Sequence, residues 1–460
     1  MKNIILIITD TFRFDNLKNF KERSVSTPAL DDFAQKRAVS IENFYTGSFP
    51  TIPHRTDLAS GKLGWINYGW QSIHQSSSNH IAQLLNKKGY NTQLICDCPH
   101  LFKSNFNDGF EAAFCHRGQE GDKPLLHLND EIKQVMPDKK TRQSPAYKGH
   151  PLVDQHRWMN RYFQNEAETF MALTAGTTVR WLEENYRAEP FFLWTDFFDP
   201  HEPWDPPEYL VEKYDPDYEG TPMLHPNYGR ADDYTPGELK NLWAHYAAEA
   251  ELVDRYIGRI LQKIDDLRLW QDTIVIITSD HGHSLGEHNC TGKSNINDND
   301  DRYWPLYPEI SRVPFLIAGG DIPGGQQLDL MAQPIDILPT AGELASVSLE
   351  PEEKLEGKSF ADQLIKGQNR HRELTVSGSY INPEKSIEQA NTPFIVSEEG
   401  WGYVPVGSEG SRELYNLQND PLAENNIAGT NKELVSNLHN RFISYLNEMG
   451  AGDDFLSLWE

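Results

Sequence analysis

Hydrophobic runs and amphipathic segments alternate along the first 370 residues of the chain. Asn3–Thr9 (NIILIIT) and Thr273–Thr278 (TIVIIT) are dominated by β-branched and aliphatic residues, the pattern of strands that are buried on both faces of a parallel sheet. Further strands are predicted over Thr92–Ile95, over Phe191–Phe198 and, as the last of the sheet, over Val313–Ala318. Helices are predicted over 79–88, 174–186, 242–267 and 334–345, where apolar residues recur at helical spacing. This alternation predicts an α/β domain over 1–370 with a doubly wound, mostly parallel sheet that is flanked by helices.

The pattern changes at about residue 371. Short alternating runs follow one another, and a helix is predicted over about 433–448. We therefore expect a small C-terminal α+β subdomain over 371–460, in which one helix packs on an antiparallel sheet. Inside the first domain, 101–165 and 205–236 lack clean periodicity and are expected to be inserted loops over the active site, because long loops in compact domains are usually functional. Four aromatic residues in or directly beside these loops could stack on a sugar or aryl ring, or equally pack within the loops: Trp158, Tyr162, Trp204 and Tyr218.

Polar side chains follow the two most hydrophobic strands. Asp10 and Thr11 come directly after the first run, and Asp280 and His281 follow the run at 273–278. Since parallel strands place their ligands at their carboxyl ends, these residues are expected to meet at one edge of the sheet. Two carboxylates and an imidazole suit one divalent ion, although Asp280 and His281 by themselves would fit a helix cap equally well.

The segment 48–61 (SFPTIPHRTDLASG) carries a second candidate group. Thr51 lies four residues before Arg55, Pro50 and Pro53 stiffen the chain, and the run 56–61 predicts the start of a helix. This arrangement suits a nucleophile that is held in a turn next to a helix N-terminus and a guanidinium. A proline-rich surface turn is the alternative.

The segment resembles the sulfatase signature, which is Cys or Ser-x-Pro-x-Arg followed by Leu, Thr and Gly at set offsets. Thr51 stands in place of the Cys or Ser. Further matches follow in family order over almost the whole chain: the opening strand with Asp10, FDPHEPW with His201, TSDHG with Asp280 and His281, Lys293, and RELYNLQNDPLAE near the C-terminus. The chain therefore resembles the sulfatase branch of the alkaline phosphatase superfamily, which also holds phosphonate monoester hydrolases and phosphodiesterases. The resemblance implies the alkaline-phosphatase-like fold.

The resemblance also implies roles for individual residues. Arg55 would neutralise charge around the nucleophile, and His201 and Lys293 would contact the oxyanion or protonate the leaving oxygen, where developing negative charge needs a proton or a cation. Asp10, Asp280 and His281 would hold the metal, and the Thr51 hydroxyl could join them. Thr11 is a further candidate metal ligand by its position, although it departs from the family pattern, in which a second Asp usually stands at this place.

A second departure concerns the substrate contacts. Sulfatases usually carry Gly-Lys-Trp-His after the strand at 92–95, whereas this chain has Cys96-Asp97-Cys98-Pro99-His100. The lysine is missing, and His100 is a shifted substitute for the histidine at best. His288 is a further candidate for a supporting contact to the substrate.

Thr51 decides the expected reaction class. In sulfatases the Cys or Ser is oxidised to formylglycine, a route that the methyl group on the threonine Cβ closes. A plain hydroxyl must form a covalent ester that water hydrolyses, as in the nucleotide phosphodiesterase relatives, and one divalent ion (Mn, Zn or Ca) would lower its pKa. The leading prediction is therefore hydrolysis of phosphate or phosphonate esters or diesters through Thr51. The alternatives are a sulfuric ester hydrolase that works without formylglycine and a catalytically silent homologue that binds anions.

The composition limits the classes of binding partner that we expect. The formal net charge of −26, from 42 basic and 68 acidic residues, argues against nucleic acid or an anionic membrane as a partner, so the expected partner is a small anionic ester. Four cysteines are too few for a disulfide framework, and Cys96 and Cys98 fit two small buried residues better than half of a metal site. The N-terminus lacks the features of a signal peptide, so a cytoplasmic location is predicted, and a homo-oligomer is left open by the sequence.

Overall fold

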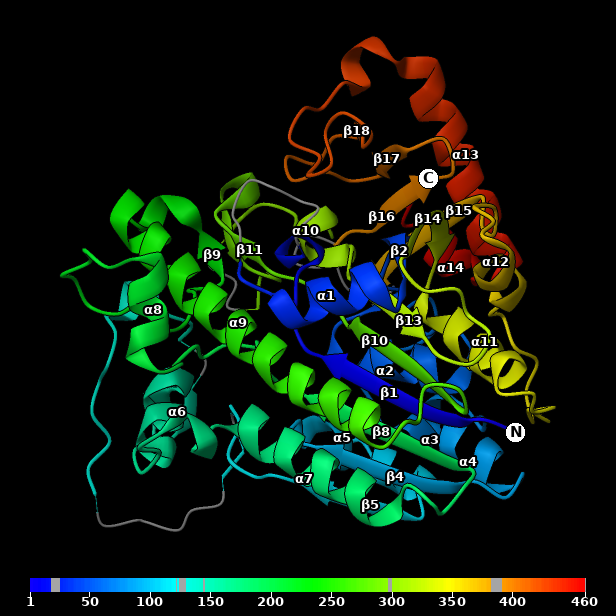
Figure 1. The fold of residues 1–460 in the computed structure, drawn as a ribbon. Helices are drawn as coiled ribbons and strands as arrows, with labels where there is room; N and C mark the ends of the chain where they lie inside the picture. Colours follow the sequence, from blue (N-terminus) through cyan, green and yellow to red (C-terminus); the bar gives the residue numbers. More distant parts are fainter. Residues whose placement is uncertain are drawn as a thin grey trace.

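In the computed structural model, one large sheet forms the centre of the first domain (Figure 1). The structure describes residues 1–17, 25–120, 122–123, 130–143, 145–296, 300–381 and 391–459. Within these ranges the main sheet has eight strands, in this spatial order: β14 (Gln326–Ala332), β2 (Val39–Phe44), β13 (Phe315–Ala318), β10 (Thr273–Ser279), β1 (Asn3–Thr9), β8 (Phe191–Phe197), β4 (Asn91–Cys96) and β5 (Ala112–Cys115). The strands from β10 to β5 are mutually parallel, whereas β13 runs antiparallel to both of its neighbours.

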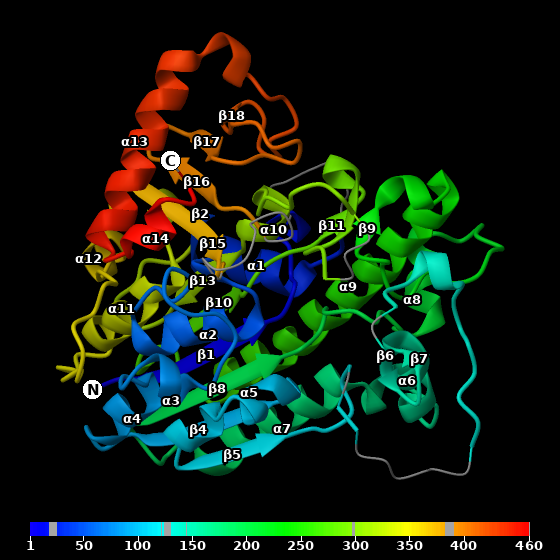
Figure 2. The ribbon, with the colours of Figure 1, turned by 180° about the vertical axis from the view of Figure 1, so that it is seen from behind.

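Helices cover both faces of this sheet (Figures 1 and 2). Because successive side chains of a strand point to opposite faces, Ile5 and Ile7 of β1 pack against one helical layer and Ile4, Leu6 and Ile8 against the other. The first layer comprises α1 (Pro28–Lys36), α7 (Phe170–Asn185), α8 (Glu208–Tyr214) and α9 (Pro236–Asp266). The second comprises α2 (Thr51–Ser60), α3 (Ile73–Ser76), α4 (Ile81–Asn86), α5 (Pro99–Lys103), α11 (Ile337–Leu344) and α12 (Ala361–Lys366).

A second sheet lies at the C-terminal end of the chain and reaches back to the first domain. Its strands are, in spatial order, β18 (Glu413–Asn416), β17 (Trp401–Val404), β16 (Phe394–Ser397), β15 (Leu374–Ser379) and β3 (Ser48–Phe49). The helices α13 (Lys432–Glu448) and α14 (Asp453–Leu456) contribute to the apolar cluster of this sheet. Since β3 pairs with β15 directly before α2 begins, the C-terminal sheet fixes the strand that leads into Thr51. The division of the chain at residue 370 stays a prediction.

The remaining elements are short. They are β6 (Pro145–Tyr147) paired with β7 (His150–Pro151), α6 (Leu152–Asn160), the small sheet of β11 (Ser284–Leu285), β12 (Cys290–Gly292) and β9 (Gly229–Arg230), and α10 (Pro308–Ser311). Single 3₁₀ turns are η1 (Phe14–Asn16), η2 (Phe106–Gly109), η3 (Asp138–Lys140), η4 (Glu166–Glu168), η5 (Ala231–Asp233), η6 (Glu287–Asn289), η7 (Pro334–Asp336) and η9 (Ala428–Thr430).

The predicted fold class is confirmed, and three details of the prediction were wrong. The strand at 315–318 is not the last of the sheet, because β14 follows it and the unpredicted β2 lies beside it. The segment 101–165 is not wholly an insertion, since Ala112–Cys115 forms the edge strand β5, which is too short and too poor in large apolar residues to show a pattern. The helix predicted to begin near Thr56 begins at Thr51, so the candidate nucleophile lies in its first turn.

The long helix α9 is amphipathic. Its buried residues alternate with charged ones along 31 residues, and no helix in the described ranges is both long and apolar enough to cross a bilayer. The helix begins at a capping box in which the Thr235 hydroxyl accepts a hydrogen bond from the Glu238 amide and the Glu238 carboxylate accepts one from the Thr235 amide. The predicted apolar stripe of this helix is buried in the core, as expected.

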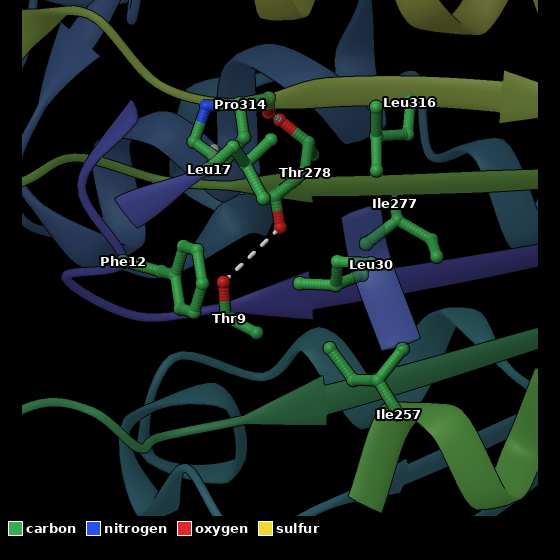
Figure 3. Close-up of a pocket in the computed structure, with 9 residues that line it drawn as sticks. All are labelled: Thr9, Phe12, Leu17, Leu30, Ile257, Ile277, Thr278, Pro314 and Leu316. Atoms are coloured by element: carbon green, nitrogen blue, oxygen red, sulfur yellow. Dashed lines mark hydrogen bonds between the residues drawn. The ribbon is translucent and has the colours of Figure 1, made fainter. Parts of the chain in front are cut away.

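A small cavity lies between β1, β10, α1 and α9 (Figure 3). Its walls are mainly apolar side chains such as Phe12, Leu30 and Ile257, and the Thr9 hydroxyl on its edge donates a hydrogen bond to the Thr278 carbonyl at 3.4 Å. A volume of about 10 Å³ holds at most one water molecule. The cavity is therefore a gap in the core packing.

Candidate active site

Three neighbouring strands bring the predicted site residues to one edge of the main sheet. β1 lies between β10 and β8 (Figure 1), and Thr9 is in register with Ser279 on one side and with Phe197 on the other. The ladder continues one residue past β1, because the Asp10 amide donates to the Phe197 carbonyl at 3.0 Å and the Asp280 amide to the Thr9 carbonyl at 3.2 Å. The carboxyl ends of these parallel strands therefore present Asp10 and Asp280 side by side.

Asp10, Asp280 and His281 form a buried cluster of the kind that holds a metal ion. Their candidate ligand atoms lie within 4.8 Å of one another, with His281 Nε2 at 3.8 Å from Asp10 Oδ1 and at 3.6 Å from Asp280 Oδ2. His281 Nδ1 donates to the Gly282 carbonyl at 2.9 Å, so Nε2 is the nitrogen that carries the lone pair. Both Asp10 Oδ2 and His281 Nε2 are buried without a hydrogen bond. One carboxylate oxygen and one imidazole nitrogen left without hydrogen bonds, next to the Asp280 carboxylate, fit a divalent cation.

The electrostatics of the cluster also favour a cation. Burial and the neighbouring Asp280 carboxylate raise the pKa of Asp10 well above its usual range. Burial lowers the pKa of His281 to about 4, so the imidazole is neutral near pH 7. Two adjacent buried carboxylates repel each other unless positive charge compensates them.

Arg55 supplies part of that positive charge and ties α2 to the strand ends. Its Nη1 lies 2.6 Å from Asp280 Oδ2 and 3.3 Å from Asp10 Oδ2, and it donates to the Thr51 carbonyl at 3.2 Å. Its Nε and Nη2 bind the Asp196 carboxylate of β8 at 2.9 and 2.8 Å. Every one of these charged side chains is fully buried. Arg55 thus fixes the first turn of α2, which contains Thr51, against Asp280.

Thr51 is itself nearly buried, with an exposure of 3%. The chain before it also contacts the cluster, because the Phe49 ring lies 4.9 Å from the His281 ring. The structure therefore places the first turn of α2 next to the carboxylate–imidazole cluster, as the resemblance implied. The role of Thr51 as nucleophile or metal ligand stays a prediction.

Thr11 acts within the cluster through hydrogen bonds. Its hydroxyl donates to Asp10 Oδ1 at 2.8 Å and accepts from Lys293 Nζ at 3.4 Å, while its amide donates to Asp280 Oδ1 at 3.0 Å. Its φ of 67° is rare for a β-branched residue, and the Tyr246 hydroxyl, which donates to the Thr11 carbonyl at 3.0 Å, helps to hold it. The geometry thus places Thr11 between Lys293 and Asp10.

His201 and Lys293 meet around a carboxylate that the sequence analysis did not single out. Glu202 is fully buried: it lies 3.8 Å from Lys293 Nζ and 3.6 Å from His201 Nδ1, and accepts a hydrogen bond from the Tyr228 hydroxyl. His283 Nδ1 lies 3.7 Å from the same carboxylate. Although burial alone would raise the pKa of Glu202, His201, Lys293 and His283 hold it well below its usual range.

The His201 side chain is in a defined tautomer. Nδ1 donates to the Glu202 carbonyl at 2.6 Å, and the ring stacks on Phe198 with centroids 4.1 Å apart. Burial, with Lys293 as a further cause, lowers the pKa of His201 to about 3. His201 is therefore a neutral imidazole near pH 7, which accepts a proton more readily than it donates one.

The two candidate substrate contacts lie in different places. His100 lies in α5, the short helix that follows β4. Its ring packs on Phe198 at 5.7 Å and is hydrogen-bonded to Glu120 Oε2 at 3.0 Å, so it shares an aromatic neighbour with His201. His288 stacks on Tyr307 at 3.6 Å and contacts the Leu422 carbonyl and Glu309. His288 stacks on Tyr307, which packs with residues of the C-terminal sheet. His100 instead contacts Phe198, on which His201 stacks.

Two of the four aromatic residues that were considered for stacking on a substrate are buried. Trp158 has an exposure of 6% and Trp204 of 0%, and their indole nitrogens donate to the backbone carbonyls of Asp130 and Pro200. For these two residues, loop packing is the correct interpretation. Tyr162 is exposed, and Tyr218 is half-buried.

Asp196 is the residue that sequence reasoning missed most clearly. It stands inside the hydrophobic strand FFLWTDF, where an aspartate is unexpected unless a buried cation pairs with it. That local conflict was a usable signal, although it does not reveal that the partner is Arg55. Cys96 and Cys98 are both fully buried, as expected.

A doubly wound sheet with a buried carboxylate–imidazole cluster at its strand ends is typical of metal-dependent hydrolases, and comparison with known proteins places the chain more narrowly. The sulfatase family model matches residues 2–347. An arylsulfatase of Clostridium perfringens is 25% identical over 98% of this chain and 95% of that protein. The chain therefore belongs to the sulfatase family, whose members hydrolyse ester bonds and typically bind a divalent metal ion.

Solved structures agree on the fold. The phosphonate monoester hydrolase of Agrobacterium radiobacter has a TM-score of 0.73 at 22% identity, with 98% of this chain and 96% of that chain covered. A protein solved in complex with its substrate D-glucosamine-2-N,6-O-disulfate has a TM-score of 0.72 at 16% identity, with 99% of each chain covered. The fold is thus shared by enzymes of both phosphonate and sulfate esters.

Proposed function

We propose that this protein is a metal-dependent hydrolase of phosphate or phosphonate esters, diesters included, with Thr51 as the nucleophile. Asp10, Asp280 and His281 would hold one divalent cation. The observation that carries the proposal is the position of Thr51, in the first turn of a helix that Arg55 ties to Asp280 at 2.6 Å.

The chemistry of Thr51 favours phosphorus over sulfur. A threonine cannot give the aldehyde on which formylglycine chemistry depends, so its hydroxyl must form an ester with the transferred group and be released by water. A divalent cation at the carboxylate–imidazole cluster supplies the positive charge that lowers the pKa of a nearby hydroxyl. Arg55 adds a fixed positive charge beside the same turn.

The proposed reaction has two steps. In the first, the ionised Thr51 oxygen, whose proton has passed to solvent, bonds to phosphorus while the bond from phosphorus to the leaving oxygen breaks. Lys293 gives that oxygen a proton. In the second step water attacks phosphorus, the bond to Thr51 breaks, and Lys293 takes back a proton from the water, as microscopic reversibility requires.

His201 is assigned to orienting the attacking water rather than to proton donation. Its Nδ1 proton is bound to the Glu202 carbonyl, and its pKa of about 3 keeps the ring neutral. The free lone pair on Nε2 can accept a hydrogen bond from water. This refines the sequence-based expectation, in which His201 and Lys293 were equal candidates for the proton donor.

The experiment compares three aryl substrates in the presence of Mn²⁺, Zn²⁺ or Ca²⁺: a phosphodiester, a phosphonate monoester and a sulfate ester. Thr51→Ala should abolish turnover, Thr51→Ser should retain part of it, and Thr56→Ala, at another buried threonine of α2, should leave it largely intact. Intact mass after brief exposure to substrate should show a phosphoryl adduct that Thr51→Ala lacks. Turnover of the sulfate ester alone would overturn the proposal.

A sulfuric ester hydrolase without formylglycine is the second candidate. It is favoured by the similarity to the arylsulfatase of Clostridium perfringens, which extends over nearly the full length of both chains. A sulfated Thr51 adduct that forms and decays with the sulfate substrate would support this alternative. A metal-loaded protein that is inert to every ester but raised in melting temperature by phosphate or sulfate would instead indicate an anion-binding homologue.

A further inference from the structure

The strand order places the site residues in a row rather than in a ring. Along the carboxyl edge of the main sheet, β10 and β1 provide the carboxylate–imidazole cluster, β8 leads to His201, and β4 leads to His100. A substrate whose reacting group lies at the cluster and at Lys293 therefore has His201 and then His100 on one side of it. The leaving group can therefore extend from the cluster along this edge of the sheet, towards His201 and His100.

Aromatic rings continue this row out to the surface. The His201 ring stacks on Phe198 at 4.1 Å, Phe198 lies 5.7 Å from the His100 ring, and His100 lies edge-on to Trp70 at 5.0 Å. The first two residues of the row, His201 and Phe198, are buried, His100 is partly exposed, and 47% of Trp70 is exposed. The row ends at Trp70, an indole side chain that is partly open to solvent.

Trp70 belongs to the connection between α2 and α3. The backbone of that connection packs closely on Tyr380, which directly follows β15, since a Cβ added to Gly69 would lie 3.2 Å from Cβ of Tyr380. The Trp70 and His100 rings are nearly perpendicular to each other, and His100 Nε2 is hydrogen-bonded to the Glu120 carboxylate. A half-exposed tryptophan offers a large flat surface on which another ring can stack.

We propose that Trp70 binds the leaving group of the substrate by stacking on a flat ring face, of the kind that an aryl group or a sugar ring presents. The inference rests on the proposed function, because it takes the metal cluster and Lys293 as the place of the reacting group. It differs from the sequence analysis, in which other aromatic residues, in or beside the two long loops, could either stack on the substrate or pack within the loops. Trp158 and Trp204 are buried and cannot do so.

The first test uses binding, so that it does not depend on turnover. Benzylphosphonate and ethylphosphonate carry a carbon in place of the ester oxygen and cannot be hydrolysed there. Isothermal titration should show the wild-type protein, loaded with Mn²⁺, binding benzylphosphonate about tenfold more tightly than ethylphosphonate, as one ring stack provides. Trp70→Ala should remove this preference, and Trp70→Phe should keep most of it.

Two controls make the result specific. Tyr209→Ala removes another exposed aromatic residue, on α8, and should leave the preference unchanged. Tyr162→Ala tests the competing idea that the long loop holds the ring. Preserved preference in Trp70→Ala, or its loss in Tyr162→Ala instead, would overturn the inference. A phosphonate analogue of glucose 6-phosphate in place of benzylphosphonate distinguishes a sugar from an aryl group.

The second test uses turnover and separates the two proposals. With a 4-nitrophenyl and a trifluoroethyl ester of the same phosphonate, Trp70→Ala should lower kcat/KM about tenfold for the aryl ester only. An equal loss for both esters would contradict stacking of the leaving group. A protein that shows the benzyl preference but turns over neither ester would retain the Trp70 assignment and refute the hydrolase proposal.

Discussion

Replacement of Asp196 by asparagine tests how the charge of the site is balanced. Arg55 contacts three carboxylates, those of Asp196, Asp280 and Asp10. With a divalent cation bound, the two charges of the ion and the one charge of Arg55 equal the three carboxylate charges. Asp196→Asn keeps the size of the side chain but leaves one positive charge in excess, and its amide group faces a guanidinium that also donates hydrogen bonds.

The expected effect is larger with metal than without it. Without the ion, the three negative charges of the carboxylates exceed the one positive charge of the guanidinium. The loss of one negative charge then partly relieves the repulsion among the carboxylates. With the ion, the substitution should weaken metal affinity by 10–100-fold, the usual effect of removing a residue that supports metal ligands. At a metal concentration of about 100 times the wild-type Kd, a loss of roughly 30-fold reduces the stabilisation by metal from about 2.7 to about 0.9 kcal/mol.

The assay measures the unfolding of wild-type and Asp196→Asn protein with and without Mn²⁺, Zn²⁺ or Ca²⁺. Asp97→Asn is the matched control, because Asp97 is also a buried carboxylate at a neighbouring strand end, and its hydrogen bonds go to the Thr174 hydroxyl and the Phe198 amide. The control should lose stability equally in both conditions and keep its metal affinity. If Asp196→Asn binds metal as tightly as wild type, the charge balance described above is wrong.

Three further predictions follow from other parts of the structure. Glu202→Gln removes the charge beside Lys293 and should lower kcat/KM by about 10–100-fold, whereas Tyr228→Phe removes a neutral donor and should have a smaller effect. Burial would raise the pKa of Asp336, but the Arg372 guanidinium holds it below its usual range. The ion pair between Asp336 and Arg372 therefore stabilises the fold above about pH 4, and this stabilisation is lost as the pH falls through the pKa of Asp336 in the folded state. Asp336→Asn should be less stable than the wild type at pH 7, and its urea midpoint should decline less steeply between pH 6 and 3. Treatment with a chelator should lower the melting temperature and abolish activity, and the ion that restores both identifies the metal, whereas an unchanged melting temperature would contradict a bound cation.

The residues of the candidate site could be found from the sequence because the chemistry lies directly after buried strands. Asp10, Asp280 and His281 each follow a run of isoleucine and threonine, and parallel strands bring their carboxyl ends to one edge. Thr51 and Arg55 could be named for a different reason, which is their spacing within the segment 48–61 and the resemblance of that segment to the sulfatase signature. The structure confirmed the fold class and brought the five residues together, but it also moved the start of the helix to Thr51.

What the sequence by itself determined was the local pattern: which segments are strands and helices, and which polar residues stand at their ends. What only the tertiary structure decided was the set of partners. Asp196 supports Arg55, Glu202 joins Lys293 to His201, and Trp70 ends a row of rings that begins at His201, although up to 141 residues separate the members of one pair. Such contacts depend on strand order and on how loops fold back over the sheet edge, and residue spacing carries no information about either.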